Sequence, residues 1–294
     1  MLKSDVTHQY LRAQMEFPNV WCPGCGIGIV LGAFIRAVDK LQIPKDDLAL
    51  VSGIGCTARV PAYVDFNTLH TTHGRPIAFA TGVKLSNPKL KVVVISGDGD
   101  LLAIGGNHFI HACRRNIDMT VILVNNYIYG MTGGQYSPTT PQHKKASTAP
   151  YLTIEPPFDT CKLAISSGAT FVARGTVYHA SQLSSLIEKA LTKKGFSVVE
   201  AMSNCHTQYG RLNREGTAVR MIQAMKDLAV PISKAQGMTP EQLEGKWVIG
   251  VLHNTERPEY IEEYEKIIRK FNPVVEEEPE QADAGEVENR LEDS

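Results

Sequence analysis

The stretch that decides the fold runs from Lys91 to Gln135 and reads KVVVISGDGDLLAIGGNHFIHACRRNIDMTVILVNNYIYGMTGGQ. It opens with an uninterrupted apolar run at 92–95 and carries a second run at 119–124, with a helix-like segment between them. Two buried parallel strands joined by a crossover helix show this pattern, because both faces of such strands are covered. We therefore predict an α/β fold, with a mostly parallel sheet and helices on both of its faces.

Glycines and polar residues follow both apolar runs, where each strand should end. Gly97-Asp98-Gly99-Asp100 follows the first run, and Asn125-Asn126 follows the second. The carboxyl ends of parallel strands face the ligand crevice of an open sheet. Glycines let backbone amides approach a diphosphate, and the side-chain oxygens of Asp98 and Asn126 are hard ligands of the kind that Mg²⁺ prefers.

This pair of motifs resembles the GDG and NN signature of thiamine diphosphate (TPP) enzymes. The resemblance implies that the metal ion of the cofactor is held by Asp98, by the side chain of Asn126 and by the main-chain carbonyl of Ile128. A solvated turn would explain GDGD alone, and a strand cap would explain the asparagines alone. Both motifs, one βαβ unit apart, favour the TPP interpretation.

Composition narrows the class of protein. The chain has 294 residues, of which 43% are hydrophobic and 21% charged, and its formal net charge is −1. This balance is that of a soluble globular protein, and it gives no argument for a nucleic-acid or membrane partner. The apolar runs are too short to span a bilayer, and the first residues lack the apolar core of a signal peptide, so we expect a cytoplasmic protein.

The α/β alternation continues on both sides of the central stretch. We predict further strands at 48–52, 66–69, 169–173 and 196–201, and helices at 27–40, 77–86, 160–167 and 181–193. The segment 136–157 has no periodicity, and a loop of that length is usually a lid or a partner-binding segment. We expect residues 1–210 to form the main domain and 211–275 a C-terminal extension, with a helix at about 215–228, a strand at 247–252 and a helix at 258–271. The acidic tail 276–294 should be disordered.

Six cysteines stand in a chain with no recognised secretion signal, so metal binding, catalysis or core packing is more common for them than disulfide formation. Cys22 and Cys25 are spaced C-x-x-C, and Cys56 and Cys205 each follow a predicted strand at the same sheet edge. Four such thiolates suit a [4Fe–4S] cluster or a tetrahedral zinc ion. The remaining two, within predicted helices, should be small buried residues: Cys113 and Cys161.

The ordered set of motifs resembles the β subunit of 2-oxoacid:ferredoxin oxidoreductases, and most closely the enzymes that act on 2-oxoglutarate. The motifs are WCPGCG (21–26), GIGC (53–56), HTTHGR (70–75), GDGD, NNYIYGMTGGQ (125–135) and a distant cysteine. The resemblance covers about residues 10 to 210. It implies one [4Fe–4S] cluster on Cys22, Cys25, Cys56 and Cys205, beside TPP and Mg²⁺. It also implies a TPP site lined by Ile54, Gly55, Cys56, Thr57, His73, Gly97, Asp98, Gly99, Asp100, Asn126, Gly130 and Met131.

The resemblance further implies the reaction. A 2-oxoglutarate enzyme of this family carries out coenzyme A-dependent oxidative decarboxylation to succinyl-CoA and carbon dioxide, or the reverse carboxylation, and passes electrons through the cluster to ferredoxin. Arg59 matches a position that faces the substrate, where a guanidinium can grip a distal carboxylate. His73 could hydrogen-bond a phosphate oxygen. A surface salt bridge for Arg59 and a solvated loop histidine are the alternatives.

A pyrimidine-binding domain with its activating glutamate is missing from the sequence pattern. We therefore expect an α subunit that completes the active site, in an α2β2 hetero-oligomer. The basic loop Gln142–Lys145 is a candidate for that interface, although solvation explains it equally well. Pyruvate, branched-chain and aryl 2-oxoacids remain alternative substrates. Two alternative functions remain. One is a non-oxidative TPP-dependent 2-oxoacid decarboxylase subunit with a zinc or structural cysteine site, and the other is a cysteine-rich assembly or iron-handling subunit without enzymatic activity.

Overall fold

Eight strands form one sheet in this computed structural model, which describes residues 6–13 and 18–272. Their order across the sheet is β2-β1-β3-β4-β8-β7-β10-β9. Neighbouring strands from β2 to β7 are parallel, whereas β10 runs antiparallel to β7. The prediction of a mostly parallel sheet is confirmed. The strands are β1 (Leu48–Ser52), β2 (Asn67–His70), β3 (Lys91–Gly97), β4 (Met119–Asn125), β7 (Phe171–Thr176), β8 (Phe196–Met202), β9 (Ala229–Pro231) and β10 (Trp247–Asn254).

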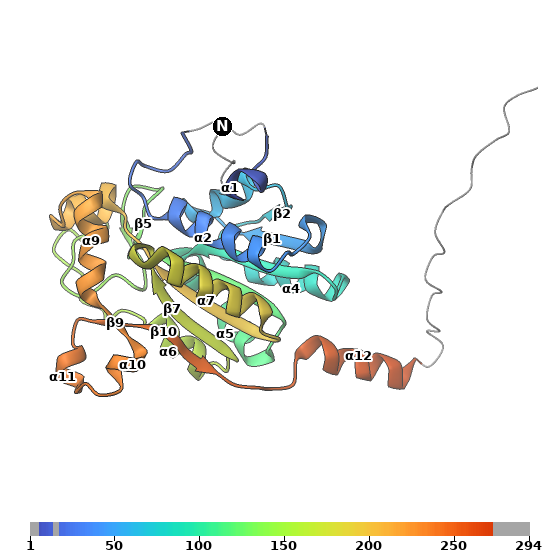
Figure 1. The fold of residues 1–294 in the computed structure, drawn as a ribbon. Helices are drawn as coiled ribbons and strands as arrows, with labels where there is room; N and C mark the ends of the chain where they lie inside the picture. Colours follow the sequence, from blue (N-terminus) through green and yellow to red (C-terminus); the bar gives the residue numbers. More distant parts are fainter. Residues whose placement is uncertain (1–5, 14–17, 273–294) are drawn as a thin grey trace, which may run out of the picture.

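Helices cover both faces of the sheet (Figure 1). One face carries α2 (Ile27–Lys40) and α7 (Ala180–Thr192), which lie side by side. The other carries α4 (Pro76–Ser86), α5 (Gly106–Arg115), α6 (Thr160–Ser166) and the start of α12 (Tyr260–Phe271). Alternate residues of β3 pack into the two cores, Val93 and Ile95 into the first and Val92 and Val94 into the second. This double burial explains why β3 reads as an unbroken apolar run.

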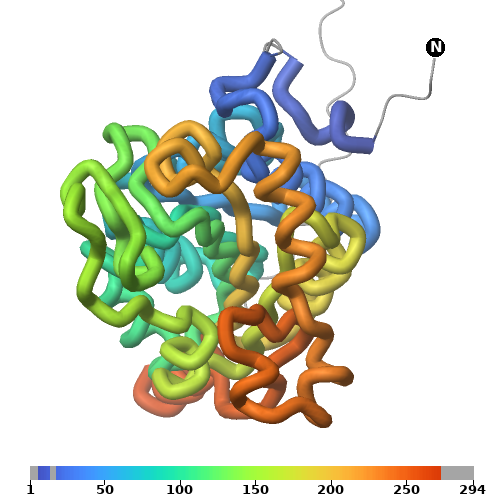
Figure 2. Tube along the Cα trace, turned by 90° about the vertical axis from the view of Figure 1, so that its left-hand side faces the viewer, coloured from blue at the N-terminus to red at the C-terminus, as the bar shows by residue number. Residues whose placement is uncertain are grey.

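The strand order places a switch point between β1 and β3. From β1 the chain moves outward to β2, and from β3 it moves the opposite way to β4. Ligand crevices of open parallel sheets lie at such points, at the carboxyl ends of the strands. Figure 2 looks onto this edge, where the segment around 126–157, in green, lies against the orange segment that follows β8. Their contacts include a hydrogen bond from the amide of Lys145 to Asn213 Oδ1 of 2.8 Å.

The region predicted as a C-terminal extension joins the main sheet. Within it, β10 pairs with β7, and Trp247 and Val251 pack against the same core as α2 and α7. The helix predicted from 258 starts at Tyr260, because the Glu259 side chain caps its first amides. The predicted strand 169–173 starts instead at Phe171, after a turn with Gly168 at φ +96°. The predicted disordered tail, 276–294, lies outside the described residues.

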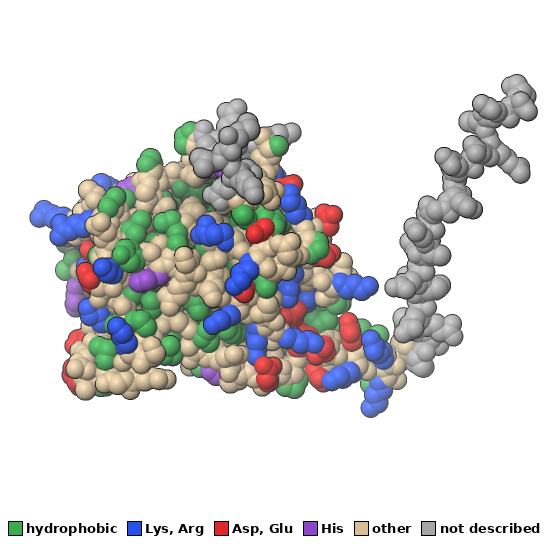
Figure 3. Space-filling view, in the orientation of Figure 1, with side chains coloured by type: hydrophobic (Ala, Val, Ile, Leu, Met, Phe, Trp, Pro, Cys, Tyr) green, Lys and Arg blue, Asp and Glu red, His purple; other side chains and the backbone are tan. Residues whose placement is uncertain are grey.

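Short elements complete the described chain. A hairpin of β5 (Ile128–Tyr129) and β6 (Gln135–Tyr136) follows β4. The short helices are α1 (Val6–Gln9), α3 (Val60–Tyr63), α8 (Arg211–Asn213), α10 (Ile232–Ala235) and α11 (Pro240–Leu243), and α9 (Ala218–Leu228) is longer. Within the described ranges, no helix combines the length and apolar character needed to cross a membrane. On the face shown in Figure 3, basic and acidic side chains are interspersed.

Candidate active site

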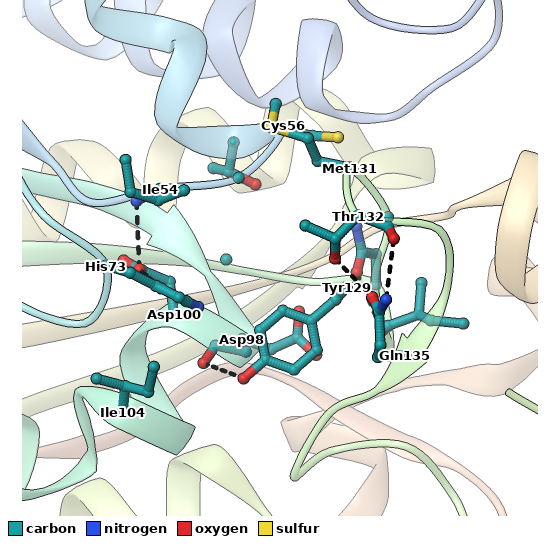
Figure 4. A pocket seen from close by; sticks show the side chains of 17 residues that line it. Ile54, Cys56, His73, Asp98, Asp100, Ile104, Tyr129, Met131, Thr132 and Gln135 are labelled. Atoms are coloured by element: carbon teal, nitrogen blue, oxygen red, sulfur yellow. Dashed lines mark hydrogen bonds and ion pairs between the residues drawn. The ribbon is translucent and has the colours of Figure 1, made fainter. Parts of the chain in front are cut away.

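A cavity of about 360 Å³ opens at the carboxyl ends of β1, β3 and β4. Each predicted cofactor contact lies on its wall, and so does Ile128 (Figure 4). The lining residues are Ile54, Gly55, Cys56, Thr57, His73, Gly97, Asp98, Gly99, Asp100, Ile104, Asn126, Ile128, Tyr129, Gly130, Met131, Thr132 and Gln135. The loops after three neighbouring strands, together with the one after β2, therefore build a single site.

Asp98 is the buried carboxylate of this cavity, with 1% of its surface exposed. Its Oδ2 accepts hydrogen bonds from the hydroxyls of Ser137, at 2.5 Å, and Thr139, at 2.6 Å. Burial raises the pKa of Asp98, and the two hydroxyls oppose that shift. A cation in the cavity would favour the charged carboxylate further. The donor set thus fits a divalent metal ion.

Asp100 has a different role in the wall. Its Oδ1 accepts hydrogen bonds from the amides of Ile54, at 3.2 Å, and Gly74, at 2.7 Å, and its Oδ2 accepts one from Ser96 Oγ at 2.6 Å. His73 Nδ1 also contacts Oδ1. These contacts occupy the carboxylate and tie the loops after β1, β2 and β3 together, so Asp100 positions the loops around the cavity.

His73 is oriented by this contact. Because Nδ1 faces Asp100, the opposite ring nitrogen, Nε2, is left to face other partners. The ring stands edge-on to Tyr129, with centroids 5.9 Å apart, and the side chain is 33% exposed. His73 can therefore present Nε2 to a phosphate oxygen in the cavity that it lines.

A tight turn after β4 carries the other predicted metal ligands. Asn125 Oδ1 accepts from the amide of Tyr127, and Asn126 Oδ1 accepts from the amide of Ile128, both at 3.2 Å. Tyr127 has φ +66°, in the left-handed region. Asn125 Nδ2 donates to Glu200 Oε1 at 2.8 Å, which anchors the turn to β8. The turn places Asn126 and Ile128 on the cavity wall with Asp98.

Four cysteines gather at the Cys56 side of the cavity. A Cβ placed on Gly130 would lie 3.3 Å from Cys205 Sγ and 3.7 Å from Cys56 Sγ, so these two sulfurs flank a glycine with little room for a side chain. Burial raises the pKa of the Cys25 thiol to about 12, and the nearby Cys205, Cys56 and Cys22 add to the shift. Held by a metal, the thiolates would be compensated by its positive charge.

Asn204 joins the loops that carry these cysteines. Its Oδ1 accepts a hydrogen bond from the amide of Gly26 at 3.0 Å, and its Nδ2 donates to the Gly24 carbonyl at 3.1 Å. The C-x-x-C loop is thereby fixed against the loop that carries Cys205, and the predicted grouping of the four cysteines in space is what the structure shows. Cys113 and Cys161, in contrast, are buried within α5 and α6.

Zinc and a [4Fe–4S] cluster are the two metal centres that the four sulfurs could hold. A tetrahedral zinc site with Zn–S bonds of about 2.3 Å places its sulfurs roughly 3.8 Å apart. Across the described ranges, the only set of three or more potential ligand groups within 4.8 Å of one another consists of Asp159, Cys161 and Glu200. The four sulfurs form no such set. Four thiolates that come from three loops are a donor set whose chemistry fits a four-iron cluster.

Arg59 does not share the cavity. It is exposed, ends the short turn Thr57–Arg59, and is absent from the cavity wall. Its charge nevertheless acts on the thiol of Cys56 and opposes the rise in pKa that burial causes there.

Comparisons with known proteins agree with this geometry. A family model described as the C-terminal TPP-binding domain of thiamine pyrophosphate enzymes matches residues 53–201. The 2-oxoglutarate synthase subunit KorB of Methanocaldococcus jannaschii is 54% identical, over 90% of this chain and 97% of that protein. The β subunit of a 2-oxoacid:ferredoxin oxidoreductase from Saccharolobus solfataricus is 40% identical, over 81% of this chain and 78% of that protein. The chain belongs to the family of 2-oxoacid:ferredoxin oxidoreductase β subunits.

A solved structure supports the same family. The 2-oxoglutarate:ferredoxin oxidoreductase from Magnetococcus marinus, with 2-oxoglutarate, coenzyme A and succinyl-CoA bound, superposes with a TM-score of 0.81 and 35% identity, over 90% of each chain. This β subunit is accordingly a subunit of an oxidoreductase and carries a TPP-binding domain.

Several residues of the β-subunit site were not predicted. Ser137 and Thr139, which hold Asp98, lie in the segment without periodicity, where nothing in the sequence signals them. Tyr129 lies within the recognised NNYIYGMTGGQ motif, and its hydroxyl donates to the Gly99 carbonyl at 2.8 Å. One charge of the basic loop Gln142–Lys145 has a partner within the chain, since Lys144 Nζ forms an ion pair with Glu215 at 2.8 Å.

A buried ion-pair network lies behind the β-subunit cavity. Arg174 donates from Nε to Glu200 and from Nη2 to Asp159, each at 2.6 Å. Cys161 Sγ lies 3.3 Å from Glu200 Oε2. Because Arg174 pairs with both carboxylates, these groups are satisfied without a metal ion. The network supports Asn125 through Glu200.

Proposed function

We propose that this chain is the TPP-binding β subunit of a 2-oxoglutarate:ferredoxin oxidoreductase, which converts 2-oxoglutarate and coenzyme A to succinyl-CoA and carbon dioxide, or runs the reverse carboxylation. One observation carries the proposal. Cys56 lines the cofactor cavity and also belongs to the group of four cysteines. The site for decarboxylation and the site for one-electron transfer therefore share a wall.

The chain's own residues would divide the work as follows. Asp98, Asn126 and the carbonyl of Ile128 would hold Mg²⁺ and, through it, the diphosphate. His73 would present Nε2 to a phosphate oxygen. Cys22, Cys25, Cys56 and Cys205 would hold one [4Fe–4S] cluster. When bound, TPP supplies the electron sink for decarboxylation, and the cluster accepts electrons one at a time.

An α subunit is the proposed structural partner, in an α2β2 assembly. Three apolar side chains of the cavity wall are exposed in this chain, Ile54 by 38%, Ile104 by 50% and Met131 by 42%. Apolar surface around a cofactor site favours a covering partner. That partner would supply the pyrimidine-binding half of the TPP site and its glutamate. Ferredoxin is the proposed electron acceptor.

The choice of 2-oxoglutarate is supported by the names of similar proteins. The relative from Methanocaldococcus jannaschii is a 2-oxoglutarate synthase subunit, and the Magnetococcus marinus enzyme binds 2-oxoglutarate, coenzyme A and succinyl-CoA. In the present chain, Arg59 is the proposed contact for the distal carboxylate.

The proposal is tested with the chain co-purified with its partner subunit without oxygen. We expect iron, sulfide, TPP and Mg²⁺ in the complex, and coenzyme A-dependent reduction of a one-electron viologen dye by 2-oxoglutarate. Pyruvate, a branched-chain and an aryl 2-oxoacid should give lower kcat/KM values. Carbon dioxide release without dye reduction, from a complex containing zinc and no iron, would instead establish a non-oxidative decarboxylase.

A matched pair of cysteine variants tests the metal site separately. Cys205→Ser should lower the iron content and dye reduction while TPP binding persists. Cys113→Ser should leave all three unchanged, because that thiol is buried in α5 away from the cluster loops. Equal iron content in the two variants would refute the assignment of the four cysteines.

A further inference from the structure

Thr207 lies between two of the cysteines that are proposed to hold the cluster. Its hydroxyl oxygen is 3.7 Å from Cys205 Sγ and 3.8 Å from Cys22 Sγ. These distances are those of hydrogen bonds between a hydroxyl and sulfur. The two cysteines are far apart in the sequence, yet one side chain contacts both.

The fold holds Thr207 in this place. It lies in the π-helical turn His206–Gly210 that directly follows Cys205. The Cys205 carbonyl accepts a hydrogen bond from the amide of Gly210 at 2.9 Å, and the Thr207 carbonyl accepts one from Arg211 Nε at 3.1 Å. Asn204 fixes the facing C-x-x-C loop from the other side. These hydrogen bonds hold the two loops that bring Thr207 to the cysteines.

Chemistry decides the direction of the hydrogen bond. A cysteine that ligates iron is a thiolate and has no proton to donate, so the Thr207 hydroxyl must be the donor. Hydrogen bonds to ligand sulfurs withdraw electron density and stabilise the more negative, reduced cluster. Cys22 is the exposed member of the four, whereas Cys205 is buried, so the Thr207 hydroxyl can reach the sulfur of either an exposed or a buried proposed ligand.

We propose that Thr207 donates a hydrogen bond to a cluster cysteine and raises the reduction potential of the cluster. The inference rests on the proposed function, and it identifies a residue that sets the reduction potential of the proposed [4Fe–4S] cluster. Thr207 is a positioning residue, since it acts on the ligand sulfurs and touches neither TPP nor substrate.

The test compares Thr207→Val with Thr207→Ser in the complex of this chain with its partner subunit. Valine keeps the shape of threonine and removes the donor, whereas serine keeps the donor. The midpoint potential is measured by potentiometric titration followed by electron paramagnetic resonance. In the valine variant we expect a lower midpoint potential. At a fixed solution potential, the ratio of reduced to oxidised cluster should be about tenfold smaller, which corresponds to a shift of about 59 mV for a one-electron couple. Serine should restore the wild-type value.

Controls separate this inference from the proposed function. Thr192→Val, at the exposed end of α7, should leave the potential unchanged. Iron and TPP contents of the valine variant should equal those of the wild type, and an exchangeable-proton coupling in electron–nuclear double resonance should disappear.

Equal potentials in fully loaded wild-type and valine proteins would overturn the inference. A wild-type protein without iron would overturn the proposed function itself. If valine prevents cluster loading, restoration by serine supports the hydroxyl contact, and failure of serine to restore it refutes the contact.

Discussion

Replacing Arg174 by methionine should destabilise the protein severely. The Arg174 side chain is 11% exposed and that of Glu200 is 2% exposed, and they are joined by a 2.6 Å ion pair. Methionine keeps most of the aliphatic stem and removes the charge. Glu200 would then remain as a buried carboxylate whose contacts are Asn125 and the weak donor Cys161.

The magnitude follows from that uncompensated charge. Removing one partner of a buried ion pair costs about 3 to 5 kcal/mol, far more than the pair contributes relative to an apolar pair. For a chain of this size the loss corresponds to a fall in Tm on the order of 10 °C. Glu200→Gln should cost less, because Arg174 keeps its second partner, Asp159, at 2.6 Å. The double variant should recover at least half of the loss, since it leaves no unpaired Glu200 charge.

Urea and thermal unfolding of the four proteins, followed by circular dichroism, give the double-mutant cycle. Lys40→Met is the control, because its ion pair with Glu188 has side chains that are 69% and 24% exposed. Exposed pairs contribute about 1 kcal/mol or less. If Arg174→Met costs no more than Lys40→Met, or if the double variant is the least stable of the set, the reasoning about the buried charge is wrong.

Three further predictions concern the site. Mg²⁺ and TPP at a hundredfold excess over Kd should raise the free energy of unfolding of the wild type by about 2.7 kcal/mol and so raise its Tm. Asp98→Asn should abolish this rise in Tm while iron content stays the same; an unchanged rise would contradict the metal assignment. Gly130→Ala should lower iron content more than Gly133→Ala, because the new Cβ at position 130 would lie 3.3 Å from Cys205 Sγ. A Cβ at position 133 meets open space, although the backbone there is strained for alanine at φ +106°. Equal iron content in both variants would count against a cluster beside Gly130. Arg59→Ala should lower kcat/KM for 2-oxoglutarate about ten- to a hundredfold, the usual contribution of a charge-assisted bond, and that for pyruvate much less; equal losses would remove Arg59 from substrate recognition.

The cavity could be predicted from the sequence because its residues follow strand ends. GDGD and the paired asparagines come directly after apolar runs, and parallel strands bring their carboxyl ends to one edge. The grouping of Cys56 with Cys205 follows from the same rule. For this grouping at one edge of the sheet, position along the chain and strand direction were sufficient, with no knowledge of side-chain contacts.

Other features have no counterpart in local sequence patterns. The apolar run of β10 does not reveal that it pairs antiparallel to β7, because strand direction depends on the connection that precedes it. Arg174 and Glu200 interrupt otherwise apolar strands, and only the assembled sheet shows that they face each other. Arg59 is exposed and does not line the cavity, and its contact with the substrate stays a prediction.

The contact between the C-x-x-C loop and the Asn204 loop also constrains when the proposed metal centre can be built. Cys25 and Asn204 are 179 residues apart in sequence, yet the Cys25 sulfur lies 4.0 Å from the Asn204 carbonyl. Closing so long a loop requires that β8 has already joined the sheet, because the cysteine that follows β8 is otherwise far from the N-terminal loop. If the four cysteines hold the proposed cluster, iron delivery follows folding of the sheet. The cluster would then link the C-x-x-C loop to the loop after β8 a second time, and its oxidative loss would leave the Asn204 hydrogen bonds as the remaining connection between these loops.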